Sequence, residues 1–408
     1  MTESFGALLR ETREAAGVSL GALAKRVNYS KSYLSKIEND VKPPNATLAR
    51  ICDGDLGAGG KLIAAALAHA PGQDADRPAP AAASRTVDRR QVLAAGTALG
   101  LALAGGPRPV PDEPVITGMR TMFEHLRHLG TQASPALVLG PLIAQVRAVH
   151  ALAAENADPI RSRLLLLAAR MAEHTGWMQQ EAGDDRAALW WTRHAAELGR
   201  AGGDQEIAGY ALVREAGLAL YRQDPVSTIG LSRQAQAVER ASPRTIALAL
   251  RREAQGHALA GDAAASELAF DRAAELLASS EVDSRPYPAL GSTAPEPVAL
   301  ARGWALCDLG RPAESAALLD RELARVPATS RRTRARFGSR RALALALSGE
   351  IDECCRTLPA TLEAAAHVDS ATVRLDLREL ARSLSRWRDH GAVREVYPSL
   401  SRVLHRHY

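Results

Sequence analysis

The first 61 residues contain every lysine of the chain, whereas the rest carries its positive charge as arginine. Several of these lysines lie close to serine and tyrosine residues. Ammonium groups and hydroxyls donate hydrogen bonds to phosphate oxygens, so side chains of these types could hold an anionic partner. The group consists of Ser19, Lys25, Ser30, Lys31, Ser32, Tyr33, Lys36 and Lys42.

Three short helices are predicted to position this group. Gly17 follows the first helix, as glycine often does at a helix C-terminus. Ser19 and Ser30 are favourable N-caps for the second and third helices, and Asn28 tolerates the left-handed backbone of the turn between them. Two short helices joined in this way form a helix-turn-helix, whose second helix enters the major groove of DNA. The predicted helices cover about residues 4–15, 20–27 and 31–39.

This arrangement gives the polar residues different tasks. The N-terminal half of the third helix faces base edges or the sugar–phosphate wall, whereas residues near the helix starts face phosphates. Glu38 is expected to cap or to form a salt bridge within the domain. Lys31, Ser32 and Tyr33 are expected at base edges or the sugar–phosphate wall, and Lys36, one turn further on, at a guanine edge or a phosphate. The residues expected at phosphates are Ser19, Lys25, Ser30 and Lys42.

A second pattern runs through the remainder of the chain. Turn signals follow apolar helices at intervals of about 40 residues, and such a period, built from helix–turn–helix units, indicates a helical solenoid. The signals are Gly183-Asp184, Gln223-Asp224, Gly261-Asp262, Gly310-Arg311, Gly349-Glu350 and Asp389-His390.

Basic residues recur at one position relative to these turns. His174, Arg214, Arg252 and Arg340 each lie ten residues before a turn position. Guanidinium groups bind carboxylates well, so we predict a ligand groove lined by these four residues and by Trp177. Surface ion pairs with acidic residues of the same region are the alternative.

Two further clusters fall in the solenoid. Six arginines between Arg331 and Arg341 could contact DNA phosphates or an acidic partner, although a solvated helix face is the more common outcome. Trp190 and Trp191 are expected to pack between adjacent repeats.

No catalytic, metal or cofactor site is expected. Gly57–Lys61 is similar to a phosphate loop but lacks its first glycine and its final Ser/Thr. The cysteines form no Cys-x-x-Cys pair and are expected to be buried thiols in a reducing cytoplasm. They are Cys52, Cys307, Cys354 and Cys355.

The expected domains are residues 1–70, a Pro/Ala/Gly-rich linker over 71–115 with a short apolar helix, and a repeat domain over 116–408. Arg89-Arg90 is similar to a twin-arginine export motif, but the uncharged stretch after it is too short to span a bilayer. A cytoplasmic location without a membrane is therefore expected, and membrane association remains a third possibility. Abundant Ala and Leu, 4% aromatic residues and the lack of strand-like alternation predict an all-α fold.

The N-terminal segment resembles the λ-repressor-like (XRE) helix-turn-helix family. Leu20 stands where the family usually has a phosphate-binding glutamine, and Asn28 and Asp40 stand where it usually has glycine. The resemblance covers about residues 5–67. It rests on Gly17-Val18-Ser19, Leu23-Ala24, Ser30, Leu34-Ser35, Ile37-Glu38, Pro43-Pro44, Leu48 and Ile51.

The array from residue 116 onward resembles tetratricopeptide (TPR-like) repeats. The whole chain thus resembles the helix-turn-helix plus TPR regulators of Gram-positive bacteria, some of which sense short peptides. This resemblance implies a five-helix DNA-binding domain, a linker and an α-solenoid. It implies a transcription regulator that binds double-stranded DNA as a homodimer and responds to a peptide, small-molecule or protein effector. A protein-interaction adaptor that recruits a partner to DNA is the alternative.

Overall fold

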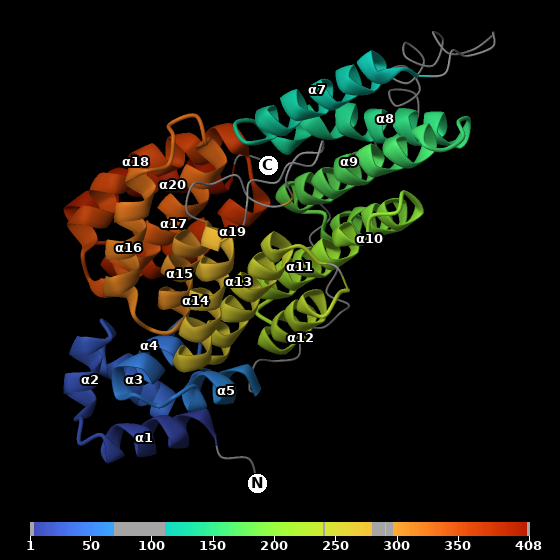
Figure 1. Ribbon diagram of the computed structural model, residues 1–408. Helices are drawn as coiled ribbons and strands as arrows, with labels where there is room; N and C mark the ends of the chain where they lie inside the picture. Colours follow the sequence, from blue (N-terminus) through green and yellow to red (C-terminus); the bar gives the residue numbers. More distant parts are fainter. Residues whose placement is uncertain (1–3, 69–110, 240, 280–289, 291–296, 406–408) are drawn as a thin grey trace.

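The computed structural model describes residues 4–68, 111–239, 241–279, 290 and 297–405. Within these residues all regular elements are helical, with nineteen α-helices and one short 3-10 helix, η2 (Ser385–Trp387) (Figure 1). The all-α prediction is therefore confirmed. Most of the predicted linker, including Arg89-Arg90 and the apolar helix after them, lies outside the described residues.

Five helices form the N-terminal domain, which we call the head. The starts of the second and third helices are set by Ser19 and Ser30, whose side chains accept hydrogen bonds from backbone amides in the first turn. Asn28 and Asp40 both have φ of 54°, so these residues adopt the left-handed backbone expected from the sequence. The head helices are α1 (Phe5–Ala15), α2 (Leu20–Arg26), α3 (Lys31–Glu38), α4 (Ala46–Leu56) and α5 (Lys61–Ala68).

The head has a hydrophobic core drawn from all five helices. An ion pair of 2.6 Å between Arg13 and Glu38 ties α1 to α3, as expected for Glu38, and both side chains are largely buried. Asp53 accepts hydrogen bonds from the amides of Gly60 and Leu62, so the glycine-rich loop before α5 is a helix start held by a carboxylate. The core side chains include Phe5, Leu9, Leu23, Leu34, Ile37, Leu48 and Leu62.

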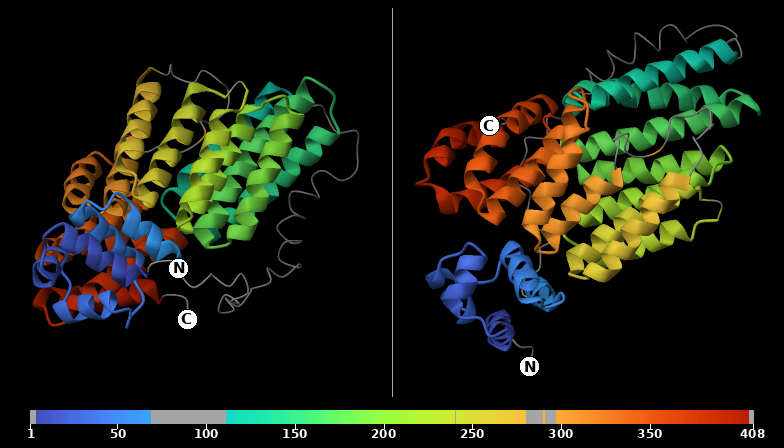
Figure 2. Two further views of the ribbon diagram at one scale, coloured as in Figure 1. Left: turned by 90° about the horizontal axis from the view of Figure 1, so that it is seen from below. Right: turned by 60° about the vertical axis from the view of Figure 1, so that its left-hand side comes forward.

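Fourteen helices of the repeat domain fall within the described residues, and most helices adjacent in sequence pack against one another. Every turn predicted from the sequence lies between consecutive helices, and the helices follow a curved array (Figure 2). The helices are α7 (Glu113–Gly130), α8 (Pro135–Ala154), α9 (Ile160–Ala182), α10 (Asp185–Ala201), α11 (Glu206–Tyr221), α12 (Pro225–Gln236), α13 (Pro243–Ala260), α14 (Ala263–Ser279), α15 (Pro297–Asp308), α16 (Pro312–Ala324), α17 (Arg331–Ser348), α18 (Ile351–Val368), α19 (Ala371–Leu384) and α20 (Gly391–Leu404).

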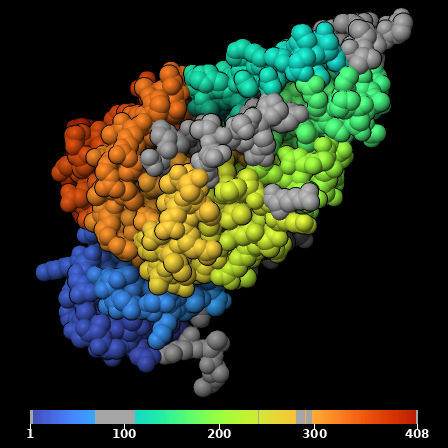
Figure 3. All heavy atoms as spheres, in the orientation of Figure 1, coloured from blue at the N-terminus to red at the C-terminus, as the bar shows by residue number. Residues whose placement is uncertain are grey.

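The head packs against the turn ends of α13, α15 and α17 (Figure 3). Gly60 meets the backbone of Gly261, and Gly54 meets that of Gly310. Such close approach of two backbones leaves no room for a Cβ atom. Arg50 and Asp308 form an ion pair of 3.7 Å with little exposure on either side. Side chains near the C-terminal end of α17 join the hydrophobic core of the head.

The tryptophan pair and the cysteines have contrasting environments. Trp191 is buried, but 57% of Trp190 is exposed, and this ring stacks on His194 with 4.9 Å between ring centroids. The expectation that both tryptophans pack between repeats is thus wrong for Trp190, because adjacent helical residues point in different directions. All four cysteines are free thiols and buried.

One described helix, α8, is long and apolar enough to cross a membrane by length and composition. Its side chains Val138, Leu142, Val146 and Val149 belong to a core shared with α9. A core helix of a folded domain passes the same test, so α8 is weak evidence for a membrane span.

Candidate nucleic-acid interface and ligand cavity

One face of α3 presents polar side chains to solvent. Lys31, Ser32 and Lys36 are exposed, whereas Leu34 and Ile37 on the same helix are completely buried. The helix is therefore anchored by its apolar face, and its basic face is available to a partner. This is the arrangement expected of a recognition helix.

The residues expected at phosphates lie around the starts of α2 and α3. Ser19 and Ser30 accept hydrogen bonds from the amides of Ala22 (3.2 Å) and Tyr33 (3.1 Å). Both serines are exposed, as are Lys25 and Lys42. Each serine satisfies one amide of its helix start, and the other amides of that turn can bind an anion.

Tyr33 is only partly exposed and braces the loop after α3. Its hydroxyl accepts a 3.3 Å hydrogen bond from the Asn45 amide, and its ring stacks on Tyr29 at 5.5 Å between centroids. The ammonium group of Lys42 lies 5.3 Å from the Tyr33 ring. Contact of Tyr33 with a base remains a prediction, and these contacts give the residue a structural role as well.

A cleft of about 880 Å³ separates this part of the head from α19 and η2, with Lys25, Ser30 and Tyr33 on the head side. On the other side, Arg386 donates a 3.0 Å hydrogen bond to the carbonyl of Asn28. Several predicted DNA-contacting residues thus share a cleft with the repeat domain.

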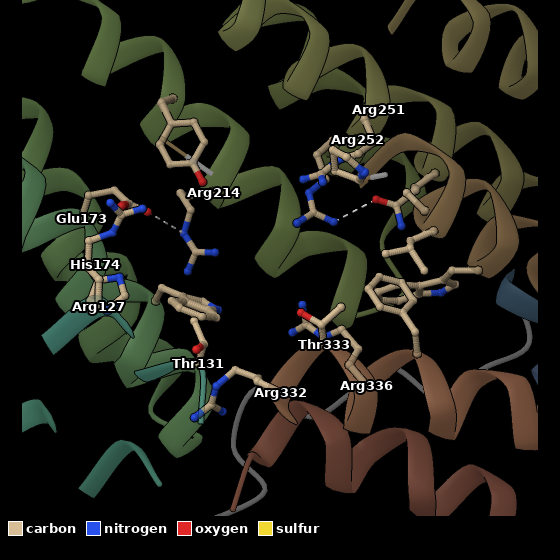
Figure 4. A pocket seen from close by; sticks show the side chains of 18 of the residues that line it. Arg127, Thr131, Glu173, His174, Arg214, Arg251, Arg252, Arg332, Thr333 and Arg336 are labelled. Carbon is tan, nitrogen blue, oxygen red and sulfur yellow. Dashed lines mark hydrogen bonds and ion pairs between the residues drawn. The ribbon is translucent and has the colours of Figure 1, made fainter. Parts of the chain in front are cut away.

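A cavity of about 310 Å³ lies among the repeat helices, and we call it the arginine cavity (Figure 4). Four of the five predicted ligand-binding residues line it, namely His174, Trp177, Arg214 and Arg252. Gln255 and Trp304, which lie seven residues before their turns as Trp177 does, also line it. The periodic positions of the sequence thus converge on one cavity.

Arg340 is not among the lining residues, which corrects its predicted place in the groove. Its guanidinium forms a 2.6 Å ion pair with Asp376 of α19 and lies 3.9 Å from the centre of the Trp304 ring. The carboxylate of α19 therefore holds this arginine behind the cavity wall. The expected run of basic residues is interrupted at this repeat.

Arg332 and Arg336 of the arginine run on α17 pair with a buried carboxylate, whereas Arg331 is exposed, so the expectation of a solvated or DNA-contacting face is wrong for part of the run. Arg332 and Arg336 donate hydrogen bonds of 2.8 and 3.0 Å to the buried carboxylate of Glu181 on α9. Burial raises the pKa of Glu181, but Arg336, Arg332 and a hydrogen bond from Ser370 outweigh it and hold this pKa at about 2. Arg341 pairs with Asp320 at 2.6 Å.

His174 lies deep in the wall of the cavity. Its ring packs edge-on against Phe123 and Trp177, with centroid separations of 5.8 and 5.2 Å. Burial, followed by repulsion from Arg127 and other arginines, lowers the pKa of His174 to about 3. The imidazole is therefore neutral at physiological pH.

Arg214, Arg251 and Arg252 have different partners within the cavity. Arg214 donates a 3.0 Å hydrogen bond to Gln180 and lies 3.8 Å from Glu173. Arg252 donates a 2.8 Å hydrogen bond to the neutral side chain of Gln255. Arg251 is 9% exposed, and its buried Nε has no partner among the described residues.

Several lining residues were missed by sequence reasoning. Arg251 is adjacent to Arg252, and Arg332 and Arg336 share one helix face at i, i+4 spacing, but neither signal indicates a cavity. The missed residues with polar or charged side chains include Arg127, Glu173, Tyr210, Arg251, Arg332 and Arg336. Within the described residues, no group of three or more His, Cys, Asp or Glu side chains could hold a metal ion.

Comparison with known proteins bears on the head alone. A family model described as a helix-turn-helix domain matches residues 4–66. No curated protein and no solved structure gave a significant match to the chain. The match covers α1–α4 and most of α5, the helices that carry the exposed basic face. The N-terminal domain is therefore similar to a helix-turn-helix domain, which supports a DNA-binding regulator.

Proposed function

We propose that this protein is a non-catalytic, sequence-specific transcription regulator whose repeat domain binds a small effector. The exposed basic face of α3, with Lys31, Ser32 and Lys36, is the observation that carries the proposal. Such a helix reads base edges in the major groove. The arginine cavity supports the second half of the proposal, since its volume of about 310 Å³ suits a small molecule. A folded protein partner, as an adaptor would need, has weaker support.

Three helices, α13, α15 and α17, both line the arginine cavity and contact the head. On α13, Arg252 lines the cavity and Gly261, just past the helix end, touches the head. The distance between these two positions is roughly 13 Å at the α-helical rise. On α15 the corresponding residues are Trp304 and Gly310, and on α17 they are Arg336 and Leu343.

A ligand that moves these helices would move the surface on which the head rests. Effector binding can change DNA binding only if the ligand has different affinities for the two arrangements of the head. The geometry of α13, α15 and α17 offers a direct physical connection for such coupling.

We also propose a cytoplasmic homodimer with no membrane association. A single small head makes a limited interface with DNA, and two heads on a two-fold-related site would supply the affinity of a specific regulator. The packing of α8 against α9 supports a place for this apolar helix inside the folded domain.

Selection of bound duplexes from a random DNA pool, with and without cell extract, tests the function. We expect enrichment of a sequence with two related half-sites and a change in occupancy when the extract is present. A pool that stays random would overturn sequence-specific regulation. Gel-shift stoichiometry then tests the dimer, and one tightly bound monomer per site would contradict it.

A further inference from the structure

The arginine cavity contains more cationic than anionic side chains. Two carboxylates line it, those of Glu124 and Glu173, and a third, Glu181, lies behind the wall and is bound by Arg332 and Arg336. The guanidinium groups that line the cavity belong to Arg127, Arg214, Arg251, Arg252, Arg332 and Arg336. Even with all three carboxylates ionised, positive charge is left without a counter-charge from these side chains.

The unbalanced positive charge is concentrated at Arg251 and Arg252. The two residues are neighbours on α13 and lie together on one wall of the cavity (Figure 4). Burial is the largest influence on both, and it lowers the pKa of Arg251 to about 10 and, together with repulsion from Arg251, that of Arg252 to about 9. Both groups therefore stay charged at neutral pH. Arg251 is buried and Arg252 is partly buried, and two such cations without a carboxylate partner are unfavourable unless an anion joins them.

Another part of the wall is apolar and aromatic. Trp304 and Tyr210 are largely buried, at 3% and 6% exposure, and Leu300 and Phe337 complete this surface. A flat apolar group can pack on such side chains while an anionic group binds the guanidinium forks. The cavity thus offers guanidinium groups to bind an anionic group and an apolar surface to pack against the rest of a ligand.

We propose that the arginine cavity binds a small organic dianion with an apolar or aromatic body, its charged group held by Arg251 and Arg252. The inference rests on the proposed effector function and specifies the chemistry of the effector. A phosphate ester and a dicarboxylate share this chemistry, because both present several acceptor oxygens to two guanidinium groups.

Isothermal titration of the full chain at pH 8 with four probes tests the proposal. Phenyl phosphate has both a dianionic group and an aromatic ring. Inorganic phosphate has the dianionic group without a ring, and benzoate has the ring with a single negative charge. Phthalate carries two carboxylates on a ring and so separates the two sources of dianion. We expect phenyl phosphate or phthalate to bind roughly 10- to 100-fold more tightly than benzoate. Equal binding of benzoate, or binding of none of the probes, would overturn the proposal.

The variant Arg251→Gln tests whether Arg251 binds the ligand or only stabilises the fold. In the ligand-free protein we expect the melting temperature to rise by about 2 °C or more, because a buried charge without a partner is removed. Probe affinity should fall roughly 10- to 100-fold in the same variant. A lower melting temperature with unchanged probe binding would overturn the proposal.

Arg302→Gln is the matched control. Arg302 lies on α15 and pairs with Asp271 at 2.6 Å, and it is absent from the cavity lining. The variant loses the same charge, and we expect probe affinity to stay within about twofold of the parent, the change typical of removing an exposed ion pair. An equal loss in Arg302→Gln and Arg251→Gln would mean that only the overall charge attracts the probe, which overturns the site.

DNA binding without any probe is measured in parallel. A chain that binds its selected duplex but none of the probes refutes the ligand class and leaves the DNA-binding function standing. A chain that binds phenyl phosphate but no DNA sequence refutes the proposed regulator and leaves the cavity assignment standing.

Discussion

Arg332 of α17 and Glu181 of α9 form a buried ion pair with a hydrogen bond of 2.8 Å, although 151 residues separate them in the chain. Arg332 also donates a 2.8 Å hydrogen bond to the carbonyl of Gly130 at the end of α7. These contacts hold α17 against α9 and the end of α7 beside the arginine cavity.

Glu181→Gln should lower the free energy of unfolding by about 3 kcal/mol or more, because Arg332 and Arg336 would stay buried without their carboxylate. Chemical denaturation of the variant and the parent gives this difference. Glu215→Gln is the control, since its partner Arg193 is 62% exposed, and a loss of at most about 1 kcal/mol is expected there. Similar losses in both variants would contradict a special role for the buried pair.

Gly310→Ala should loosen the head. Gly310 has φ of 72°, and a Cβ atom there would collide with the carbonyl of Arg50 on α4. Gly203→Ala is a matched control, because Gly203 has φ of 84° and nothing within 4 Å of an added Cβ. Both variants carry a backbone cost of about 1 kcal/mol. Hydrogen exchange should show faster exchange in α4 only for Gly310→Ala, and equal protection in both would exclude this contact as a determinant of docking.

Lys31→Ala and Lys36→Ala should weaken binding to the selected duplex by roughly tenfold each. If Lys36 contacts a phosphate, its removal should also reduce the salt dependence by about one counterion, whereas loss of a base contact should relax the sequence preference. Fluorescence anisotropy at several salt concentrations separates these outcomes. Lys61→Ala, at the start of α5, should bind like the parent. An equal loss with Lys61→Ala would indicate non-specific attraction by charge.

His174 should make the protein less stable as the pH falls. The pKa of its buried imidazole is about 3 in the folded state, compared with an ordinary value of 6.5. As the pH falls, His174 therefore becomes protonated in the unfolded state before it does so in the folded state. The free energy of unfolding decreases as the pH drops below 6.5. The expected loss at pH 5 is about 2 kcal/mol. His174→Gln should flatten the dependence between pH 6.5 and 5 in denaturation experiments, and an unchanged slope would exclude His174 as its source.

The head could be predicted well from the sequence because its signals are local. Ser19 and Ser30 bond to amides three residues away, and asparagine at position 28 is a residue type that tolerates the left-handed backbone of the turn. The repeat period likewise placed His174, Arg214 and Arg252 at one cavity. The predictions of the helix caps and of the cavity-lining residues both depend on short sequence spacings, and the regular geometry of a helix fixes where residues at such spacings lie.

The remaining features depend on partners far away in the chain. Arg340 leaves the cavity wall because Asp376 of another helix binds it. The arginine run of α17 suggested a solvated face because its carboxylate, Glu181, lies in a different repeat. Docking of the head depends on pairs such as Arg50 with Asp308. No local pattern specifies such pairings, so sequence reasoning could not find them.

Contacts between the head and the repeat domain come from α4, the loop before α5 and the turn at Asn28. Lys31, Ser32 and Lys36 lie on α3 and are exposed. Substitutions at these three positions could therefore change the preferred DNA sequence without altering docking or the arginine cavity. Under the proposed function, the preferred DNA sequence and the preferred effector can therefore change independently during evolution, and duplicated copies of the gene could acquire new target promoters while keeping the same effector.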